Sequence, residues 1–246
     1  MMLRQAESCG LETQSAVVTA LEKEGKQWLV RTTEDEYAGK AVIVTAGADY
    51  NRLGVPGEER LTGRGVSYCA TCDAAFFKGQ HVAVVGGGDA AMDEGLFTTR
   101  YADRVTAIHR RDQLRAGAIL QERAFANPKM EFVWNTVVTE ILGDGAVSGV
   151  KLRNRETGEE STMDVAAVFI FIGQHPNTDF LRGLVSMDEG GHILVNEWME
   201  TELPGLYAAG DARQNAARQV VSSAGDGATA AIAAEHYLSS NFAAEE

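Results

Sequence analysis

The pattern of apolar and polar positions predicts alternating strands and helices in the middle of the chain. Apolar runs of strand length alternate with longer stretches of helical periodicity, in the order strand, helix, strand, helix, strand, over residues 81–85, 90–101, 105–109, 118–126 and 132–135. This alternation predicts a parallel sheet covered by helices. Further strands are expected at 137–142, 147–153 and 165–172.

Both ends of the chain have a different pattern, in which short strands dominate. A helix over residues 1–10 precedes expected strands at 15–20, 28–33 and 41–45, and polar turns at 22–25 and 34–36 make these a small β-meander. The last third predicts strands at 192–195 and 206–209 and an alanine-rich helix over about 220–238. The run 54–65 holds four glycines and a proline, which is typical of a connector between domains.

Composition narrows the class of protein. At 246 residues and 45% hydrophobic, the chain is long enough for one large or two modest domains. A formal net charge of -13 argues against nucleic acid as a partner, because phosphates would be repelled. No apolar run approaches the roughly 18 residues that span a bilayer, and residues 1–5 lack the apolar core of a signal peptide. The expected compartment is the cytoplasm, with no membrane association.

A glycine-rich loop follows the first central strand. Gly86-Gly87-Gly88-Asp89-Ala90-Ala91 fits the pattern G-x-G-x-x-A at a strand-to-helix turn. Glycine permits the tight turn and the approach of a pyrophosphate to backbone N–H groups, and the small final residue lets the helix pack on the strand. A plain tight turn is the alternative, but the flanking elements favour a nucleotide site.

The end of the next strand indicates which nucleotide is bound. An NAD site places a carboxylate there for the ribose, whereas this strand runs through His109 into Arg110, Arg111 and Arg115. Planar guanidinium groups suit a 2′-phosphate, so we expect NADPH. The alternative is a solvated surface cluster of arginines.

A C-x-x-C motif lies upstream of the glycine loop. It consists of Cys69 and Cys72, and Asp73 follows directly. A structural zinc site needs four ligands and the sequence offers no second pair, so no metal site is expected. A structural disulfide or two inert thiols would leave the adjacent acid unexplained. We therefore expect a reversible disulfide between Cys69 and Cys72, with Cys9 free.

Several strings together resemble one family. The segments SYCATCD, VAVVGGGDAAMDE, IHRRDQLRA, IGQHPNTDF and LYAAGDAR are similar to bacterial thioredoxin reductase of the low-molecular-weight flavoprotein type. The resemblance implies an α/β fold of the two-dinucleotide-binding flavoprotein type, with a Rossmann-like NADPH-binding domain inserted in an FAD-binding domain. Residues 1–52 and 178–246 would belong to the FAD-binding domain and 53–177 to the NADPH-binding domain. The family forms homodimers and reduces thioredoxin or a thioredoxin-like protein.

The resemblance also implies roles for individual residues. Cys72 would lie against the flavin, Cys69 would attack the thioredoxin disulfide, and Asp73 would protonate the departing thiolate. The glycine loop and the arginines would hold NADPH. FAD would contact Gly210, Asp211, Arg218, Gln219 and Val220, the last three at the start of the final helix.

The sequence departs from the family in one respect. The family begins with a strand, a G-x-G-x-x-G loop and a helix that bind the ADP half of FAD, and these 246 residues contain no such segment. We favour a truncated reductase over a natural short protein that has shed FAD and persists as a non-catalytic NADP(H)-binding or partner-binding remnant. The 246 residues are expected to bind NADPH, to hold FAD weakly or not at all, and to show little turnover.

Overall fold

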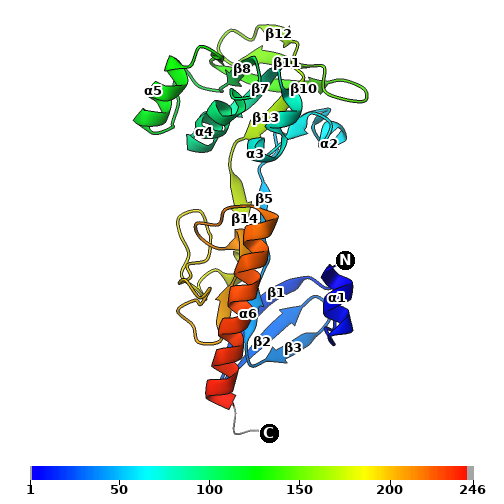
Figure 1. Ribbon diagram of the computed structural model, residues 1–246, viewed down its shortest axis with the longest axis vertical. Helices are drawn as coiled ribbons and strands as arrows, with labels where there is room; N and C mark the ends of the chain where they lie inside the picture. The colour runs from blue at the N-terminus through cyan, green and yellow to red at the C-terminus, as the bar shows by residue number, and fades with distance from the viewer. Residues whose placement is uncertain (1, 243–246) are drawn as a thin grey trace. The chain divides into compact units, whose positions relative to one another are not determined.

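The computed structural model describes residues 2–242 and divides into two compact units (Figure 1). Unit 2 is the continuous segment Tyr50–Gln174, and it is inserted between the two segments of unit 1, Met1–Asp49 and His175–Glu246. This confirms an α/β architecture in which one unit is inserted in another. The chain passes between the units through two short paired strands, β5 (Ala48–Tyr50) and β14 (Gln174–Pro176).

Unit 2 is built on a five-stranded parallel sheet. Its strand order is β6-β13-β7-β8-β9, with β6 at Val66–Ser67, β13 at Ala167–Phe171, β7 at His81–Gly86, β8 at Arg104–Ile108 and β9 at Met130–Val133. The helices of this unit are α2 (Glu58–Leu61), α3 (Ala70–Asp73), the 3-10 helix η1 (Ala74–Phe77), α4 (Asp89–Thr98) and α5 (Ala118–Ala126). The predicted alternation of strands and helices over 81–135 is therefore confirmed.

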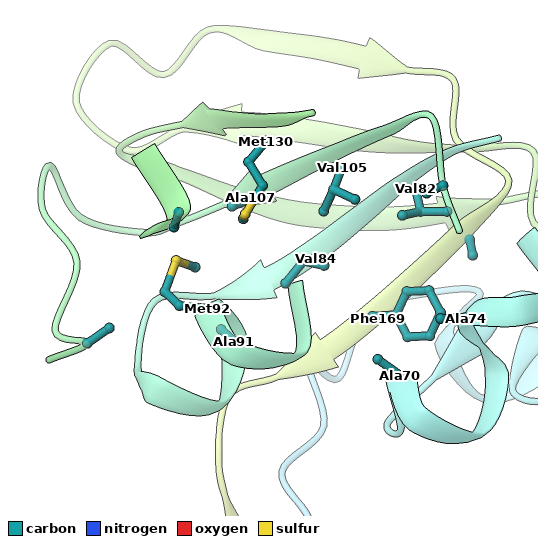
Figure 2. Packing of buried hydrophobic residues seen from close by; sticks show 14 of the residues in the cluster. Ala70, Ala74, Val82, Val84, Ala91, Met92, Val105, Ala107, Met130 and Phe169 are labelled. Atoms are coloured by element: carbon teal, nitrogen blue, oxygen red, sulfur yellow. The ribbon is translucent and has the colours of Figure 1, made fainter. Parts of the chain in front are cut away.

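The central strands β7 and β13 of this sheet are almost entirely apolar because both of their faces are buried. Along β7, Val82 and Val84 point into a core shared with helices α3, α4 and α5, as Figure 2 shows around Met92 and Phe169. Ala83 and Val85 point into a second core on the opposite face. That core is closed by an antiparallel sheet of β10 (Thr136–Leu142), β11 (Gly149–Asn154) and β12 (Glu160–Met163).

Unit 1 combines two small sheets with one long helix. An antiparallel sheet is formed by β1 (Val18–Glu24), β2 (Gln27–Thr32) and β3 (Glu36–Gly39), and a parallel pair by β4 (Val42–Val44) and β15 (Leu206–Ala208). Trp28 and Leu206 share one core, and Tyr207 packs with alanines of helix α6 (Val220–Phe242) in another. The remaining elements are α1 (Met2–Ser8) and the 3-10 helices η2 (Asp179–Leu181) and η3 (Gly210–Ala212).

Three expectations for unit 1 were wrong. The segment 22–24, expected as a turn, continues β1, because Lys23 and its neighbours pair with β2 and only Gly25 adopts the left-handed turn conformation. Residues 41–45 do not complete the meander, since β4 pairs with β15 and the third meander strand is β3. Residues 192–195 form no strand: the buried Ile193 makes only isolated bridges, to Met187 and Arg213.

Two further differences concern the ends and the glycine-rich run. Helix α6 extends beyond the predicted end at 238, and Met1 of the predicted first helix lies outside the described residues. The run 54–65 contains helix α2, whose Leu61 is fully buried in the core of unit 2, so it is packed rather than an open link. Within residues 2–242 no helix has both the length and the apolar character needed to cross a membrane.

Candidate active site and nucleotide cleft

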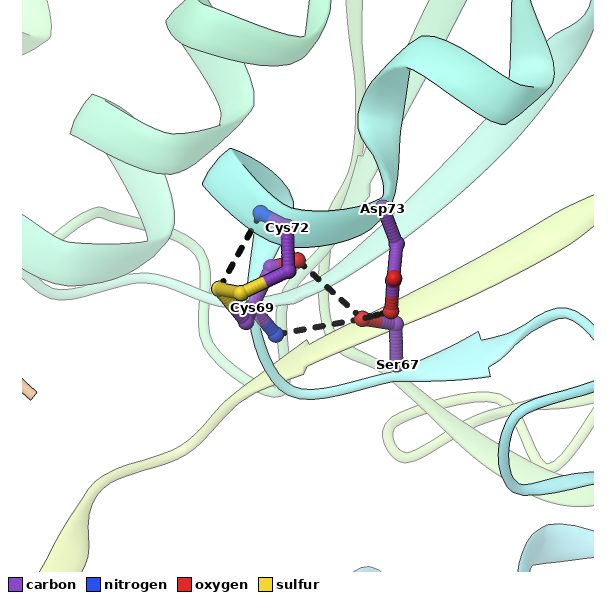
Figure 3. Close-up of a disulfide and its surroundings, with 4 residues drawn as sticks. All are labelled: Ser67, Cys69, Cys72 and Asp73. Carbon is purple, nitrogen blue, oxygen red and sulfur yellow. Dashed lines mark hydrogen bonds between the residues drawn. A yellow bond between two sulfur atoms is a disulfide. The ribbon is translucent and has the colours of Figure 1, made fainter. Parts of the chain in front are cut away.

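The two cysteines of the C-x-x-C motif form a disulfide at the start of α3 (Figure 3). Their Cα atoms lie 5.3 Å apart, which confirms the expected pairing, and Cys9 is free and exposed. Cys69 is the N-cap residue of α3, and its Sγ accepts a hydrogen bond from the backbone N–H of Cys72 at 3.1 Å. Such a donor stabilises negative charge on Sγ once the disulfide is opened.

The acid beside the disulfide has a buried partner. Ser67 is 5% exposed, and its hydroxyl donates to Asp73 Oδ2 at 2.6 Å while accepting from the backbone N–H of Cys69 at 3.1 Å (Figure 3). The carboxyl group of Asp73 is thereby tied to the main chain of the first cysteine. A proton on Asp73 would therefore lie in a hydrogen-bond network that reaches the main chain of Cys69 through Ser67.

A second carboxylate contacts the disulfide helix, and the sequence interpretation missed it. Glu94 on α4 faces the backbone N–H groups of Ala70 and Thr71, in the first turn of α3, and the dipoles of these groups act on its carboxylate. Burial raises the pKa of Glu94, and these two N–H groups oppose the rise. Its Oε2 is buried without a hydrogen-bond partner among residues 2–242. The contact depends on the packing of two helices, so no local pattern in the sequence indicates it.

The glycine loop connects β7 to α4, and the first two of its three glycines leave no room for a side chain. A Cβ on Gly86, whose φ is +149°, would lie 2.3 Å from the carbonyl oxygen of Phe171 and 2.7 Å from Ala91 Cβ. A Cβ on Gly87 would lie 2.3 Å from the ring of His109. Gly88 is the N-cap of α4, and a Cβ there meets nothing within 4 Å. Open space in front of a helix N-terminus is where a pyrophosphate binds in this type of loop.

The arginine segment is held against the glycine loop by main-chain hydrogen bonds. The N–H groups of Arg115 and Ala116 donate to the carbonyl oxygen of Gly87 at 2.7 and 3.2 Å. The N–H of Gly117 donates to Asp89 Oδ1 at 2.7 Å. Asp89, predicted as part of the cofactor loop, is therefore a support for the arginine segment in this structure.

A cleft of about 530 Å³ lies at the carboxyl ends of β7, β8 and β13. Its lining includes the predicted residues Gly86, Gly87, His109, Arg110 and Arg115. Sequence interpretation missed Asn51, Arg52 and Thr136, which also line it, and Arg111 is exposed outside the lining. The carboxyl edge of a parallel sheet is where open α/β sheets bind ligands.

His109 is a wall of this cleft rather than an exposed ligand. It is 4% exposed, its ring stands edge-on to Trp134, and its Nε2 has no hydrogen-bond partner in the described part of the chain. Burial lowers the pKa of His109, and the charges of Arg115, Arg111 and Arg110 lower it further. A neutral ring is therefore favoured, which leaves the positive charge of the cleft to the guanidinium groups.

The residues predicted to hold FAD belong to unit 1. Gly210 has a φ of +71° and starts η3, and Asp211 Oδ1 accepts from the hydroxyl of Ser223 on α6 at 3.4 Å. Arg218 and Gln219 directly precede α6, and Val220 is its first residue and 83% exposed. The structure thus brings the Gly210-Asp211 turn to the beginning of α6.

This turn is fixed by an ion pair that the sequence interpretation missed. Asp226 accepts two hydrogen bonds from Arg213, at 2.7 and 2.8 Å, and a third from the backbone N–H of Gly210 at 3.1 Å. The Arg213 hydrogen bonds lower the pKa of Asp226. The two residues are 13 apart in sequence and carry no recognisable motif, so only the fold shows the pair.

Comparisons with known proteins agree with this geometry. Residues 4–227 match the family model described as pyridine nucleotide-disulphide oxidoreductase. The chain is 49% identical over 217 residues to a thioredoxin reductase of Bacillus subtilis, covering 87% of this chain and 69% of the relative. It is 42% identical over 247 residues to a thioredoxin reductase of Peptoclostridium acidaminophilum, covering 98% and 78%.

A solved structure gives the same result for the fold. The crystal structure of thioredoxin reductase from Streptococcus pyogenes superposes with a TM-score of 0.94 at 45% identity, covering 97% of this chain and 78% of that one. A family match over most of the chain and relatives well above 30% identity agree with the disulfide and the nucleotide cleft described above. The chain belongs to the thioredoxin reductases within the pyridine nucleotide-disulphide oxidoreductase family.

Proposed function

We propose that this chain is the NADPH-dependent reductase of a protein disulfide, with thioredoxin or a thioredoxin-like protein as its partner. The observation that carries the proposal is the Cys69–Cys72 disulfide, which lies in the same unit as a glycine-lined and arginine-lined nucleotide cleft. NADPH and FAD, when bound, supply the electron pair that opens this disulfide. Thioredoxin, with a potential of about -270 mV, is a chemically reasonable acceptor.

The residues present fit NADPH and the flavin half of FAD. At the NADPH site, side chains on Gly86 and Gly87 would overlap protein atoms, whereas the space at Gly88, before the N-terminus of α4, is open to a ligand. The neighbouring arginines suit a 2′-phosphate. At the FAD site, Gly210, Asp211 and the segment 218–220 would hold the flavin half of the cofactor. The N-terminus of α6 there favours negative charge.

The dithiol exchange follows from the groups around α3. The thiolate of Cys69, stabilised by the N–H of Cys72, attacks one sulfur of the partner disulfide, and the bond between the two partner sulfurs breaks. Asp73, held by Ser67, gives a proton to the departing partner thiolate. Cys72 Sγ then attacks Cys69 Sγ, and the proton of Cys72 passes to the second partner sulfur as its bond to Cys69 breaks. The Cys69–Cys72 disulfide re-forms and the partner leaves as a dithiol.

The nucleotide assignment is tested by removing two arginines. Arg110→Ala with Arg111→Ala should weaken NADPH binding by about 2 to 4 kcal/mol, the value for charge-assisted hydrogen bonds to one phosphate. NADH, which lacks the 2′-phosphate, is the internal control and should be nearly unchanged. Equal losses for the two nucleotides, measured by fluorescence titration, would contradict the assignment.

The redox assignment is tested by flavin loading and turnover. Residues 1–246 expressed by themselves are expected to hold FAD weakly and to turn over slowly, because their single glycine fingerprint is assigned to NADPH. The purified protein is incubated with excess FAD, desalted, and assayed for bound flavin and for NADPH-dependent reduction of thioredoxin. Stoichiometric flavin with normal turnover would contradict the expected impairment. Turnover that survives Cys69→Ser or Cys72→Ser would contradict the dithiol mechanism.

A further inference from the structure

We propose that Arg155 determines NADPH specificity together with the three predicted arginines, by holding the main chain of the segment that presents them. This inference rests on the proposed NADPH site. Arg155 lies in the exposed turn between β11 and β12, outside the glycine loop and outside the β8 segment that carries the other arginines. Its place in the sequence gives no hint of a nucleotide contact.

The first contact is made by the side chain. Arg155 Nη1 donates a hydrogen bond to the carbonyl oxygen of Arg110 at 3.0 Å. Arg110 is the first arginine after β8, and its own side chain lines the cleft. A guanidinium donor on this carbonyl fixes the direction of the peptide that carries the Arg110 side chain.

The second contact runs through the corner between β9 and β10. The backbone N–H of Arg155 donates to the carbonyl oxygen of Asn135 at 2.6 Å, and the N–H of Asn135 donates to the carbonyl oxygen of Arg111 at 3.1 Å. Asn135 has a φ of +50°, a left-handed conformation that asparagine tolerates better than most residues. Arg155 therefore reaches the carbonyls of both Arg110 and Arg111, one directly and one through Asn135.

The turn that carries Arg155 is itself held in shape. Asn154 Oδ1 accepts hydrogen bonds from the N–H groups of Glu156 and Thr157 at 2.9 and 3.0 Å, and the N–H of Gly158 donates to the carbonyl oxygen of Asn154. On the opposite side, the N–H of Arg115 is bonded to Gly87. The arginine segment is thus fixed at both of its ends before any ligand arrives.

A segment fixed in this way loses less conformational freedom when its side chains pair with a phosphate. Removal of Arg155 would leave the arginines in place but would allow their backbone to move. The loss should therefore appear in the recognition of the 2′-phosphate and not in binding of the rest of the nucleotide. Such a selective loss of 2′-phosphate recognition would distinguish Arg155 from residues that only stabilise the fold.

The test compares two nucleotide fragments on the full chain by calorimetry, 2′,5′-ADP and 5′-ADP. Arg155→Ala should raise the dissociation constant of 2′,5′-ADP by about three- to tenfold, the loss of about one hydrogen bond, and change that of 5′-ADP less than about twofold. Arg153→Ala is the matched control, because it removes the same charge from an exposed position of β11 and should leave both constants within about twofold. Arg155→Lys keeps the charge without the fork of donors and should recover only part of the affinity.

Four outcomes would overturn the inference. Equal losses for Arg155→Ala and Arg153→Ala, or a loss that vanishes in about 0.5 M salt, would indicate a screened charge effect and not a held segment. The role of Arg155 would be refuted, with the NADPH site intact, by one pair of results. In that pair, Arg155→Ala leaves binding unchanged while Arg110→Ala with Arg111→Ala abolishes the preference for 2′,5′-ADP. Unchanged preference in the double variant would refute the NADPH site itself.

Discussion

The variant Gly87→Ala adds a single methyl group to the glycine loop. It should show whether Gly87 is required for packing inside the protein. In the structure, a Cβ at this position lies 2.3 Å from Cε1 and Nδ1 of His109 and 2.7 Å from Cγ. The ring is buried against Trp134 and cannot move away without opening the core. The backbone of Gly87 is equally restrained, because its carbonyl accepts from Arg115 and Ala116.

The expected cost of Gly87→Ala follows from this overlap. Forcing one methyl group into a packed site costs about 1 to 3 kcal/mol. For a chain of this length, each kcal/mol lowers the melting temperature by about 2 to 4 °C, so a fall of about 2 to 12 °C is expected. Gly88→Ala is the matched control, since its Cβ meets nothing within 4 Å, and it should leave the melting temperature nearly unchanged.

Differential scanning calorimetry of the two variants measures these shifts, and a double-mutant cycle with His109→Ala identifies the cause. If the clash with the ring is responsible, Gly87→Ala should cost much less in the His109→Ala background, with a coupling of at least about 1 kcal/mol. Additive effects would refute the reasoning. So would equal melting temperatures for Gly87→Ala and Gly88→Ala.

Two other predictions concern charged groups. Glu94→Gln removes a negative charge beside the first turn of α3, so the more reactive thiol of the reduced protein should have a lower pKa. The pH dependence of thiol alkylation measures this pKa. An unchanged pH profile would show that Glu94 does not act on the dithiol. Asp226→Asn should cost about 2 to 4 kcal/mol of stability at neutral pH, because it leaves Arg213 with a neutral partner in a mostly buried site. Since Arg213 lowers the pKa of Asp226, the stabilisation is present above the ordinary value of 3.8 and is lost as the pH falls through the lowered pKa, so denaturation curves of the variant and the parent should converge in acid and not at alkaline pH.

Strands with two buried faces were predictable from the sequence, and two strands that carry mostly exposed residues were missed. The apolar runs of β7 and β8 and the glycine loop between β7 and α4 indicate their structures locally, because burial on both faces leaves few polar positions. Strands β3 and β12 carry mostly exposed residues and therefore lack an apolar signal. The opposite error occurred at Ile193, an apolar residue that is buried without a neighbouring strand long enough to pair with.

The candidate site divides in the same way. Cys69, Cys72 and the three predicted arginines belong to contiguous motifs whose chemistry can be inferred from residue types alone. Glu94, Arg155 and the Arg213–Asp226 pair act through contacts between elements that are separate in sequence. Only the packing of those elements shows what the three groups touch.

The placement of Glu94 beside α3 makes the local stability of the disulfide-bearing turn depend on a helix that contains neither cysteine. Amide protons in the first turn of a helix ordinarily exchange with water freely, since they have no partner within the helix. Those of Ala70 and Thr71 face the carboxylate of Glu94, about 9 Å along α4 from its glycine N-cap. Their exchange therefore reports local separation of α3 from α4, and the same separation would loosen the turn that carries the disulfide. A ligand that stabilises the N-terminus of α4 would slow both processes.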